Sequence, residues 1–163
     1  MKKIKFFLII FSLFFFSNCG FEPLYSSHNK NNEELLHISV KNIKDRSGQI
    51  LKNDLSKKLN PQNKKTITKY YLFVDLVENI EEMGIRKDMS ATRSHLRIKA
   101  EYKLQTVKDG EIILKSSIEA LSSYDIVESI YATIIAEKDA RNKGLKIIND
   151  SIINELAIYF INK

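Results

Sequence analysis

The sequence has few of the residues that form cross-links, bind metals or make sharp turns. It contains one cysteine, two prolines, five glycines, three histidines and no tryptophan in 163 residues. One cysteine cannot form a disulfide framework within the chain. The fold must therefore depend on its hydrophobic core.

Motifs for catalysis are also missing. The three histidines share no metal-ligand spacing, and there is no glycine-rich phosphate loop or nucleophile elbow. Glu81 and Glu82 stand before a Met-Gly pair, which is typical of a solvated turn at a strand end rather than an acid/base pair. Asp139 stands alone in a helical pattern and is expected to be a surface charge or a structural hydrogen-bond acceptor. The sequence predicts no enzyme, no cofactor and no metal site.

The longest apolar run stands at the start of the chain. It covers residues 6–16, follows three lysines and is interrupted by one serine. A helix that crosses about 30 Å of hydrocarbon needs about 20 apolar residues, so this run is too short for a permanent span. A basic start followed by a short apolar segment is the layout of a secretory signal. The alternative is a buried core helix, although the run has no polar face to present to water.

Cys19 follows this run directly. The residues around it resemble a bacterial lipoprotein signal, which is cut ahead of a cysteine whose thiol is acylated. Phe16, Ser17 and Asn18 occupy the positions of the leucine and two small residues in that pattern. The resemblance implies cleavage between Asn18 and Cys19 and lipid attachment at Cys19. A free exported thiol is the alternative.

Lipid attachment would anchor the protein to a membrane without a span. Each buried methylene contributes about 0.8 kcal/mol, and two or more acyl chains give lasting retention. Gly20, rather than an aspartate, follows the cysteine, which by resemblance to enterobacterial lipoproteins favours the outer membrane. Four of the next residues are too apolar for a spacer and are expected to contact a partner or the bilayer edge: Phe21, Pro23, Leu24 and Tyr25.

The remaining chain divides into a tether and one domain. Residues 26–34 are polar throughout and predict a flexible tether. The predicted organisation is a signal peptide (1–18), a lipidated N-terminus with its tether (19–34) and a single domain (35–163), a size that needs only one core.

The net charge gives little support for nucleic-acid binding. The formal charge is +6, from 26 basic and 20 acidic residues. Three of the lysines lie in the signal, so the mature chain has 23 basic residues against 20 acidic ones, or +3. Backbone recognition of nucleic acid needs a dense basic surface, which this chain does not show.

The apolar pattern predicts the order strand, helix, three strands, helix. The strands are expected at 35–43, 70–80, 95–105 and 112–120, and the first helix at 49–60 after a turn at 45–48. A second helical pattern covers 126–160, with one long helix expected and a break near Gly144 as the alternative. Its apolar positions are Val127, Ile130, Tyr131, Ile134, Ile135, Ala140, Ile147, Ile148, Ile152 and Leu156. We expect an α+β fold in which both helices cover one face of a mixed four-stranded sheet.

Cations are concentrated in residues 84–99, where the only acid is Asp88. They are expected to converge on one end of the sheet, where arginine suits forked contacts to phosphate. The alternative is a solvated sheet edge that these cations protect from pairing. The candidates for such phosphate contacts are Arg86, Lys87, Arg93, Arg97 and Lys99.

Four stretches of the chain together resemble one protein family. They are CGFEPLY at 19–25, IKDRSGQILKNDL at 43–55, GIRKDMSATRSHLRIKAEYKL at 84–104 and SYDIVESIYATIIAEKDARNKGL at 123–145. They are similar, in the same order, to segments of the lipopolysaccharide-assembly lipoprotein LptE in its alphaproteobacterial form. The resemblance implies a non-enzymatic subunit of the outer-membrane lipopolysaccharide translocon that plugs an LptD-like β-barrel and contacts lipopolysaccharide. It also implies a domain on the periplasmic side and inside that barrel.

Two other functions stay open at this point. One is an auxiliary lipoprotein that activates a peptidoglycan synthase or an envelope transporter. The nine residues 26–34 would reach only about 15–18 Å as a coil, which argues against a far-reaching activator. The other is a hydrolase, which the missing motifs disfavour.

Overall fold

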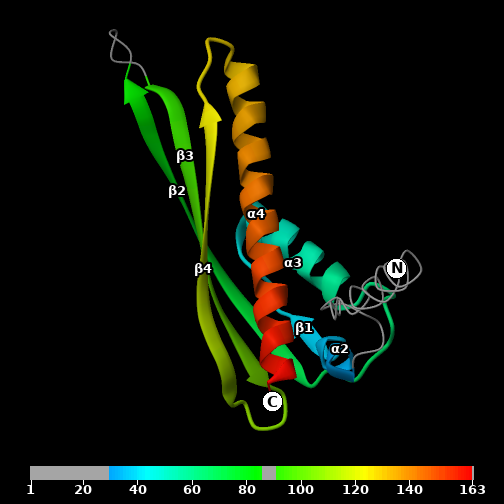
Figure 1. The fold of residues 1–163 in the computed structure, drawn as a ribbon. Helices are drawn as coiled ribbons and strands as arrows, with labels where there is room; N and C mark the ends of the chain where they lie inside the picture. Colours follow the sequence, from blue (N-terminus) through cyan, green and yellow to red (C-terminus); the bar gives the residue numbers. More distant parts are fainter. Residues whose placement is uncertain (1–29, 86–90, 163) are drawn as a thin grey trace, which may run out of the picture.

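The computed structural model describes residues 30–85 and 91–162. A four-stranded sheet has the order β1-β2-β3-β4. Strand β1 (Ile38–Val40) is parallel to β2 (Tyr70–Ile85), and β2, β3 (Ala91–Thr106) and β4 (Ile112–Asp125) form an antiparallel meander. Helices α3 (Asp45–Leu59) and α4 (Ile130–Ile161) pack on one face of this sheet (Figure 1). The predicted fold class and element order are confirmed.

The two faces of the sheet differ as the sequence predicts. Along β3 the even positions from Leu96 to Leu104 are buried, whereas the odd positions are half-buried or exposed. The buried positions share one core with the leucines of α3 at 51, 55 and 59 and with the isoleucines of α4 at 148 and 152. The other face of the sheet carries the charged side chains.

Helix α3 begins four residues earlier than expected. Residues 45–48, predicted to be a turn, form its first turn, and Asp45 has a positive φ of 64°. Gly48 is buried against Ile43: an added Cβ would lie 2.6 Å from Ile43 Cγ2 and 2.9 Å from its carbonyl carbon. Apolar periodicity begins only at Leu51, so the sequence pattern could not indicate this first turn.

Helix α4 is continuous over 32 residues, or about 48 Å. Ser129 caps it by accepting a hydrogen bond from the Ala132 amide at 3.4 Å. Gly144 does not break the helix. An added Cβ there would lie 2.9 Å from Ile98 Cδ1, so glycine allows α4 to approach β3 closely. The expectation of one long helix is confirmed.

Two further differences concern the ends of elements. A short helix, α2 (Lys30–Leu35), includes residues 30–34, where a flexible tether was expected, and β1 is shorter than the strand predicted at 35–43. Strand β2 continues through Glu81 and Glu82, so the predicted turn is wrong. The carboxylate pair favoured a turn in the sequence, but long pairing with β3 keeps these residues in the sheet.

The described chain begins and ends at the same end of the domain (Figure 1). Lys69 pairs with Glu34 of α2 at 2.7 Å, and the neighbouring Tyr70 packs on Phe160 with a ring-centroid distance of 5.2 Å. The start of α4 lies at the opposite end, beside the tip of β4 (Figure 1). Within residues 30–85 and 91–162, no helix is both long and apolar enough to cross a membrane.

Candidate interaction site

Several of the predicted site residues lie outside the described residues. They are Cys19 with its cleavage site, the apolar residues Phe21, Pro23, Leu24 and Tyr25, and the cations Arg86 and Lys87. Their proposed roles stay predictions. The structure places the other three cations, Arg93, Arg97 and Lys99, along β3 on the face away from α3 and α4.

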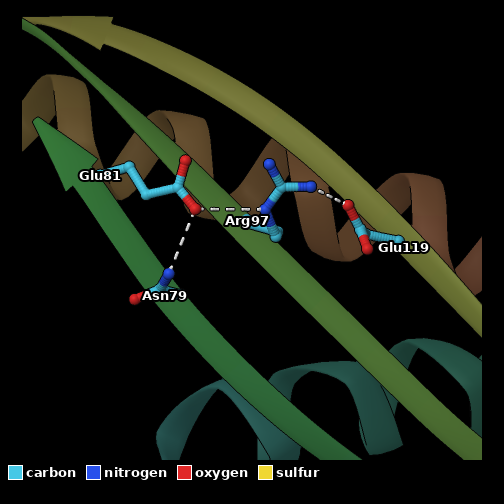
Figure 2. A network of polar contacts seen from close by, with 4 residues as sticks. All are labelled: Asn79, Glu81, Arg97 and Glu119. Carbon is cyan, nitrogen blue, oxygen red and sulfur yellow. Dashed lines mark hydrogen bonds and ion pairs between the residues drawn. The ribbon is translucent and has the colours of Figure 1, made fainter. Parts of the chain in front are cut away.

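Arg97 lies at the centre of an ion-pair network that spans three strands (Figure 2). Its Nε is 3.5 Å from Glu81 Oε1 of β2, and its Nη1 donates a hydrogen bond to Glu119 of β4. Asn79 Nδ2 donates to the same oxygen of Glu81 at 3.3 Å. The hydrogen bond to Glu119 raises the pKa of Arg97 above its usual value.

The two neighbouring cations are paired as well. Arg93 Nε lies 2.9 Å from Asp125 Oδ1, and Lys99 Nζ lies 2.7 Å from Glu101 Oε1. The hydrogen bond between Lys99 and Glu101 raises the pKa of the lysine and lowers the pKa of the glutamate. These three cations therefore face four carboxylates, those of residues 81, 101, 119 and 125.

The sequence suggested a cluster with one acid, and the structure brings in four others. Three of them come from β2 and β4, and the fourth lies just beyond the basic stretch on β3. Only strand pairing brings the first three to the cluster, so counting charges along the chain could not find them. The described part of the cluster is a solvated, ion-paired surface, but it is not the sheet edge of the alternative, because β3 lies between β2 and β4.

A second surface is apolar and lies at the start of α4. This surface has five exposed residues, and we call it the α4 ridge: Val127, Ile130, Tyr131, Ile134 and Ile135. Ile130 is 78% exposed and Ile134 is 56% exposed. The helical pattern in the sequence grouped these residues with the core positions of the helix. They continue that pattern, but no described part of the chain covers them.

Beside the ridge is a pocket of about 450 Å³ where α3, β2 and α4 meet, and we call it the α3–α4 pocket. Its lining residues are Asp45, Arg46, Ser47 and Ile50 of α3, Glu78 of β2, and Ile134, Glu137, Lys138, Arg141 and Asn142 of α4. The segments 43–55 and 123–145, far apart in sequence, therefore meet at one place. Ile134 belongs to both the pocket and the ridge.

Arg141 crosslinks the wall of this pocket. Its Nε donates to Glu78 Oε2 at 2.9 Å and its Nη2 donates to Glu137 Oε1 at 2.6 Å. Burial disfavours its charge, but the two hydrogen bonds outweigh burial and raise its pKa. In contrast, Arg46 and Lys138 make no ion pair or hydrogen bond with any side chain in the described ranges.

Other predicted features have simple surroundings. Asp139 is exposed and pairs with Lys143 at 2.7 Å, which confirms a surface charge. His37 Nδ1 lies 2.7 Å from the Ile67 carbonyl oxygen. No group of histidine, cysteine and acidic residues in residues 30–85 and 91–162 could hold a metal ion.

Comparison with known proteins finds similar folds among solved structures but no match by sequence. No protein-family model and no curated protein matches the sequence. A protein described as a lipoprotein from Caulobacter crescentus CB15 is similar over 82% of this chain and 97% of its own, with a TM-score of 0.65 and 23% identity. Rare lipoprotein B from Shewanella oneidensis covers 77% of this chain and 96% of its own, at a TM-score of 0.60 and 14% identity.

A third solved structure extends the same likeness. The minor lipoprotein from Acinetobacter baumannii matches 74% of this chain and 90% of its own, with a TM-score of 0.58 and 14% identity. The match covers most of each chain, so the likeness concerns the whole domain rather than a shared motif. At these identities it shows that the chain has the same fold as three bacterial proteins described as lipoproteins.

Proposed function

We propose that this chain is a lipid-anchored protein of the bacterial outer membrane that plugs an LptD-like β-barrel in lipopolysaccharide transport. Its role is to bind and stabilise the barrel, without catalysis. The anchor is the lipid on Cys19, and the domain lies on the periplasmic side and inside the barrel. Lipopolysaccharide contacts the domain directly.

The observation that carries this proposal is a lipoprotein-type N-terminus joined to this particular fold. A basic start, an apolar run and Cys19 precede a domain whose structural neighbours are described as lipoproteins. Two segments of the family resemblance, 43–55 and 123–145, also form one continuous surface around the α3–α4 pocket. Core residues such as Leu51 and Ala140 contribute to this likeness, but Asp45 and Arg46 are exposed and line the pocket. A likeness at such exposed residues supports a shared binding role, because packing alone would not require it.

The transport role is tested by depleting the protein in cells that depend on it. Newly made lipopolysaccharide should then fail to reach the cell surface, while the lipopolysaccharide already there is diluted by growth. Lipopolysaccharide export that continues at its normal rate after depletion would contradict the proposal. A Cys19→Ser variant, which cannot carry the thioether lipid, should lose its membrane attachment.

Direct contact with lipopolysaccharide is tested by the triple variant R86E/R93E/R97E. If this cluster contacts phosphates, the variant should bind lipopolysaccharide more weakly than the unchanged protein in a pull-down. The control K57E/K65E/K108E makes the same change in net charge at exposed lysines elsewhere. Equal binding by both variants would leave the cluster as an ion-paired surface, in line with the four carboxylates that face Arg93, Arg97 and Lys99.

A further inference from the structure

The α4 ridge repeats the core-facing stripe of its own helix. In an α-helix 18 residues make five turns, so residues 18 apart lie at the same angle around the axis. Ile130 and Ile148 form such a pair, and Ile134 and Ile152 form another. Ile148 and Ile152 are fully buried in the domain core, whereas Ile130 and Ile134 are mostly exposed. The apolar stripe is therefore longer than the part of the domain that covers it.

The exposed part of the stripe has no charge to keep it in water. From Ser129 to Ala136 the sequence has no charged residue, and the helix is already formed and capped there. Ile80, on the helix-facing side of β2 and two residues beyond Glu78 of the pocket, is also 44% exposed. An apolar stripe with spacings of three and four residues is the kind of surface onto which another helix packs.

The charges beside the ridge indicate what the occupant carries. Arg46 and Lys138 line the α3–α4 pocket without an anionic partner among the described residues, and Lys138 lies one turn beyond Ile134. Asp45, Glu78 and Glu137 line the same pocket. These three carboxylates would repel a polyanionic lipid headgroup. The mixture of positive and negative charges therefore favours a peptide that brings a single carboxylate to the two cations.

The chain between Phe21 and Lys30 is too short to bring the apolar N-terminal residues onto the ridge. Phe21 is nine residues before Lys30, a distance of at most about 32 Å in a fully extended chain. Helix α2 lies at the other end of α4, where its Glu34 pairs with Lys69 and the neighbouring Tyr70 packs on Phe160. Ile134 lies about 39 Å from Phe160 along the helix. The occupant therefore belongs to another molecule.

We propose that the α4 ridge and the α3–α4 pocket together bind an amphipathic helical segment of a partner protein. The apolar face of that segment packs on Ile130, Tyr131 and Ile134, and an aspartate or glutamate one or two turns further along pairs with Arg46 and Lys138. This inference does not depend on whether the partner is a β-barrel.

The test is photo-crosslinking of the full-length protein in its native envelope. A photoreactive amino acid replaces Tyr131 or Ile134 in separate experiments. The control position is Ile158, which is 50% exposed on the same helix near its other end. Both ridge positions should give an adduct with one other protein, and Ile158 should not. The crosslinked peptide should contain an apolar segment with an acidic residue within two turns.

Charge reversal distinguishes specific docking from nonspecific hydrophobic association. The double variant R46E/K138E should reduce adduct yield about tenfold, as expected for the loss of charge-assisted hydrogen bonds. The matched control K57E/K65E should leave the yield unchanged, and a change of the partner's acidic residue to lysine should restore it in R46E/K138E. Adducts with lipid, with a second copy or with residues 19–29 would overturn the proposal, and so would no adduct or a yield insensitive to R46E/K138E.

The same experiment distinguishes this inference from the proposed function. A captured partner that is not an outer-membrane barrel, with no barrel among the co-purifying proteins, would support the inference and contradict the barrel partnership. A barrel that co-purifies equally well with the unchanged protein and with R46E/K138E, together with no adduct at the ridge, would do the reverse.

Discussion

Two isoleucines at the same angle of one helix should differ sharply in their importance for stability. Ile148 and Ile130 lie five turns apart on α4, and each can be changed to alanine. Ile130 is the first residue of α4 whereas Ile148 is in its interior, but the difference in helix propensity, at most about 0.7 kcal/mol, is small beside the packing term. The difference in packing dominates, because Ile148 is fully buried and Ile130 is 78% exposed.

The magnitude follows from burial. Ile148→Ala leaves a cavity in the core and should lower the free energy of unfolding by about 2–5 kcal/mol. Ile130→Ala removes a side chain that contacts mostly water and should change it by about 0.5 kcal/mol or less. The second pair, Ile152 and Ile134, should behave in the same way, since Ile152 is fully buried as well.

The assay is guanidinium unfolding of the detergent-solubilised protein, followed by far-UV circular dichroism. A loss of about 3–4 kcal/mol should move the midpoint down by about 1 M, given the usual slopes for guanidinium. The Ile130→Ala protein should unfold at the same midpoint as the unchanged protein. An equal loss at both positions would mean that the ridge is covered in the isolated protein, and the case for an unfilled docking surface would fail.

Two further predictions concern residues that hold the domain together. Gly48→Ala should lower the free energy of unfolding by about 1–3 kcal/mol, because the new Cβ meets backbone and side-chain atoms of Ile43; a thermal melt equal to that of the unchanged protein would refute this. The buried Tyr102 donates a hydrogen bond to Glu155, and burial and that hydrogen bond raise its pKa above its usual value of 10. Tyr102→Phe should cost about 1.5–3 kcal/mol below pH 10, as for a hydrogen bond to a charged group. As the pH rises above about 10, the tyrosine hydroxyl loses its proton in the unfolded state before it does so in the folded state. The difference in unfolding free energy between the unchanged protein and Tyr102→Phe should therefore shrink above this pH. A difference that stays constant up to about pH 11 would contradict the assignment.

The sequence predicted the fold well where local pattern and burial coincide. The alternation from Leu96 to Leu104 fixes which face of β3 is buried, since a one-residue shift would turn the apolar side chains to water. The length of α4 was also predictable, because Gly144 costs less in a helix than the rest of the periodic pattern contributes. Gly48 was not read as helical, because its role depends on contact with Ile43.

The candidate site was harder to predict, since its properties depend on neighbours from other elements. Arg97 stood in a basic stretch, yet Glu81 and Glu119 neutralise it from the two adjacent strands. The apolar period of α4 correctly indicated a helix, but periodicity does not tell whether another element covers Ile130 and Ile134. In both cases the missing information is tertiary.

The central claim is that this protein works as the partner of an outer-membrane β-barrel, and co-purification tests it most directly. The full-length protein, carrying an affinity tag at its C-terminus, is extracted from envelopes in a mild detergent and isolated at its native expression level. The account predicts that one large outer-membrane barrel protein elutes with it in a fixed ratio and stays bound through size-exclusion chromatography. Recovery of the protein only as a free, unpartnered lipoprotein would contradict the account.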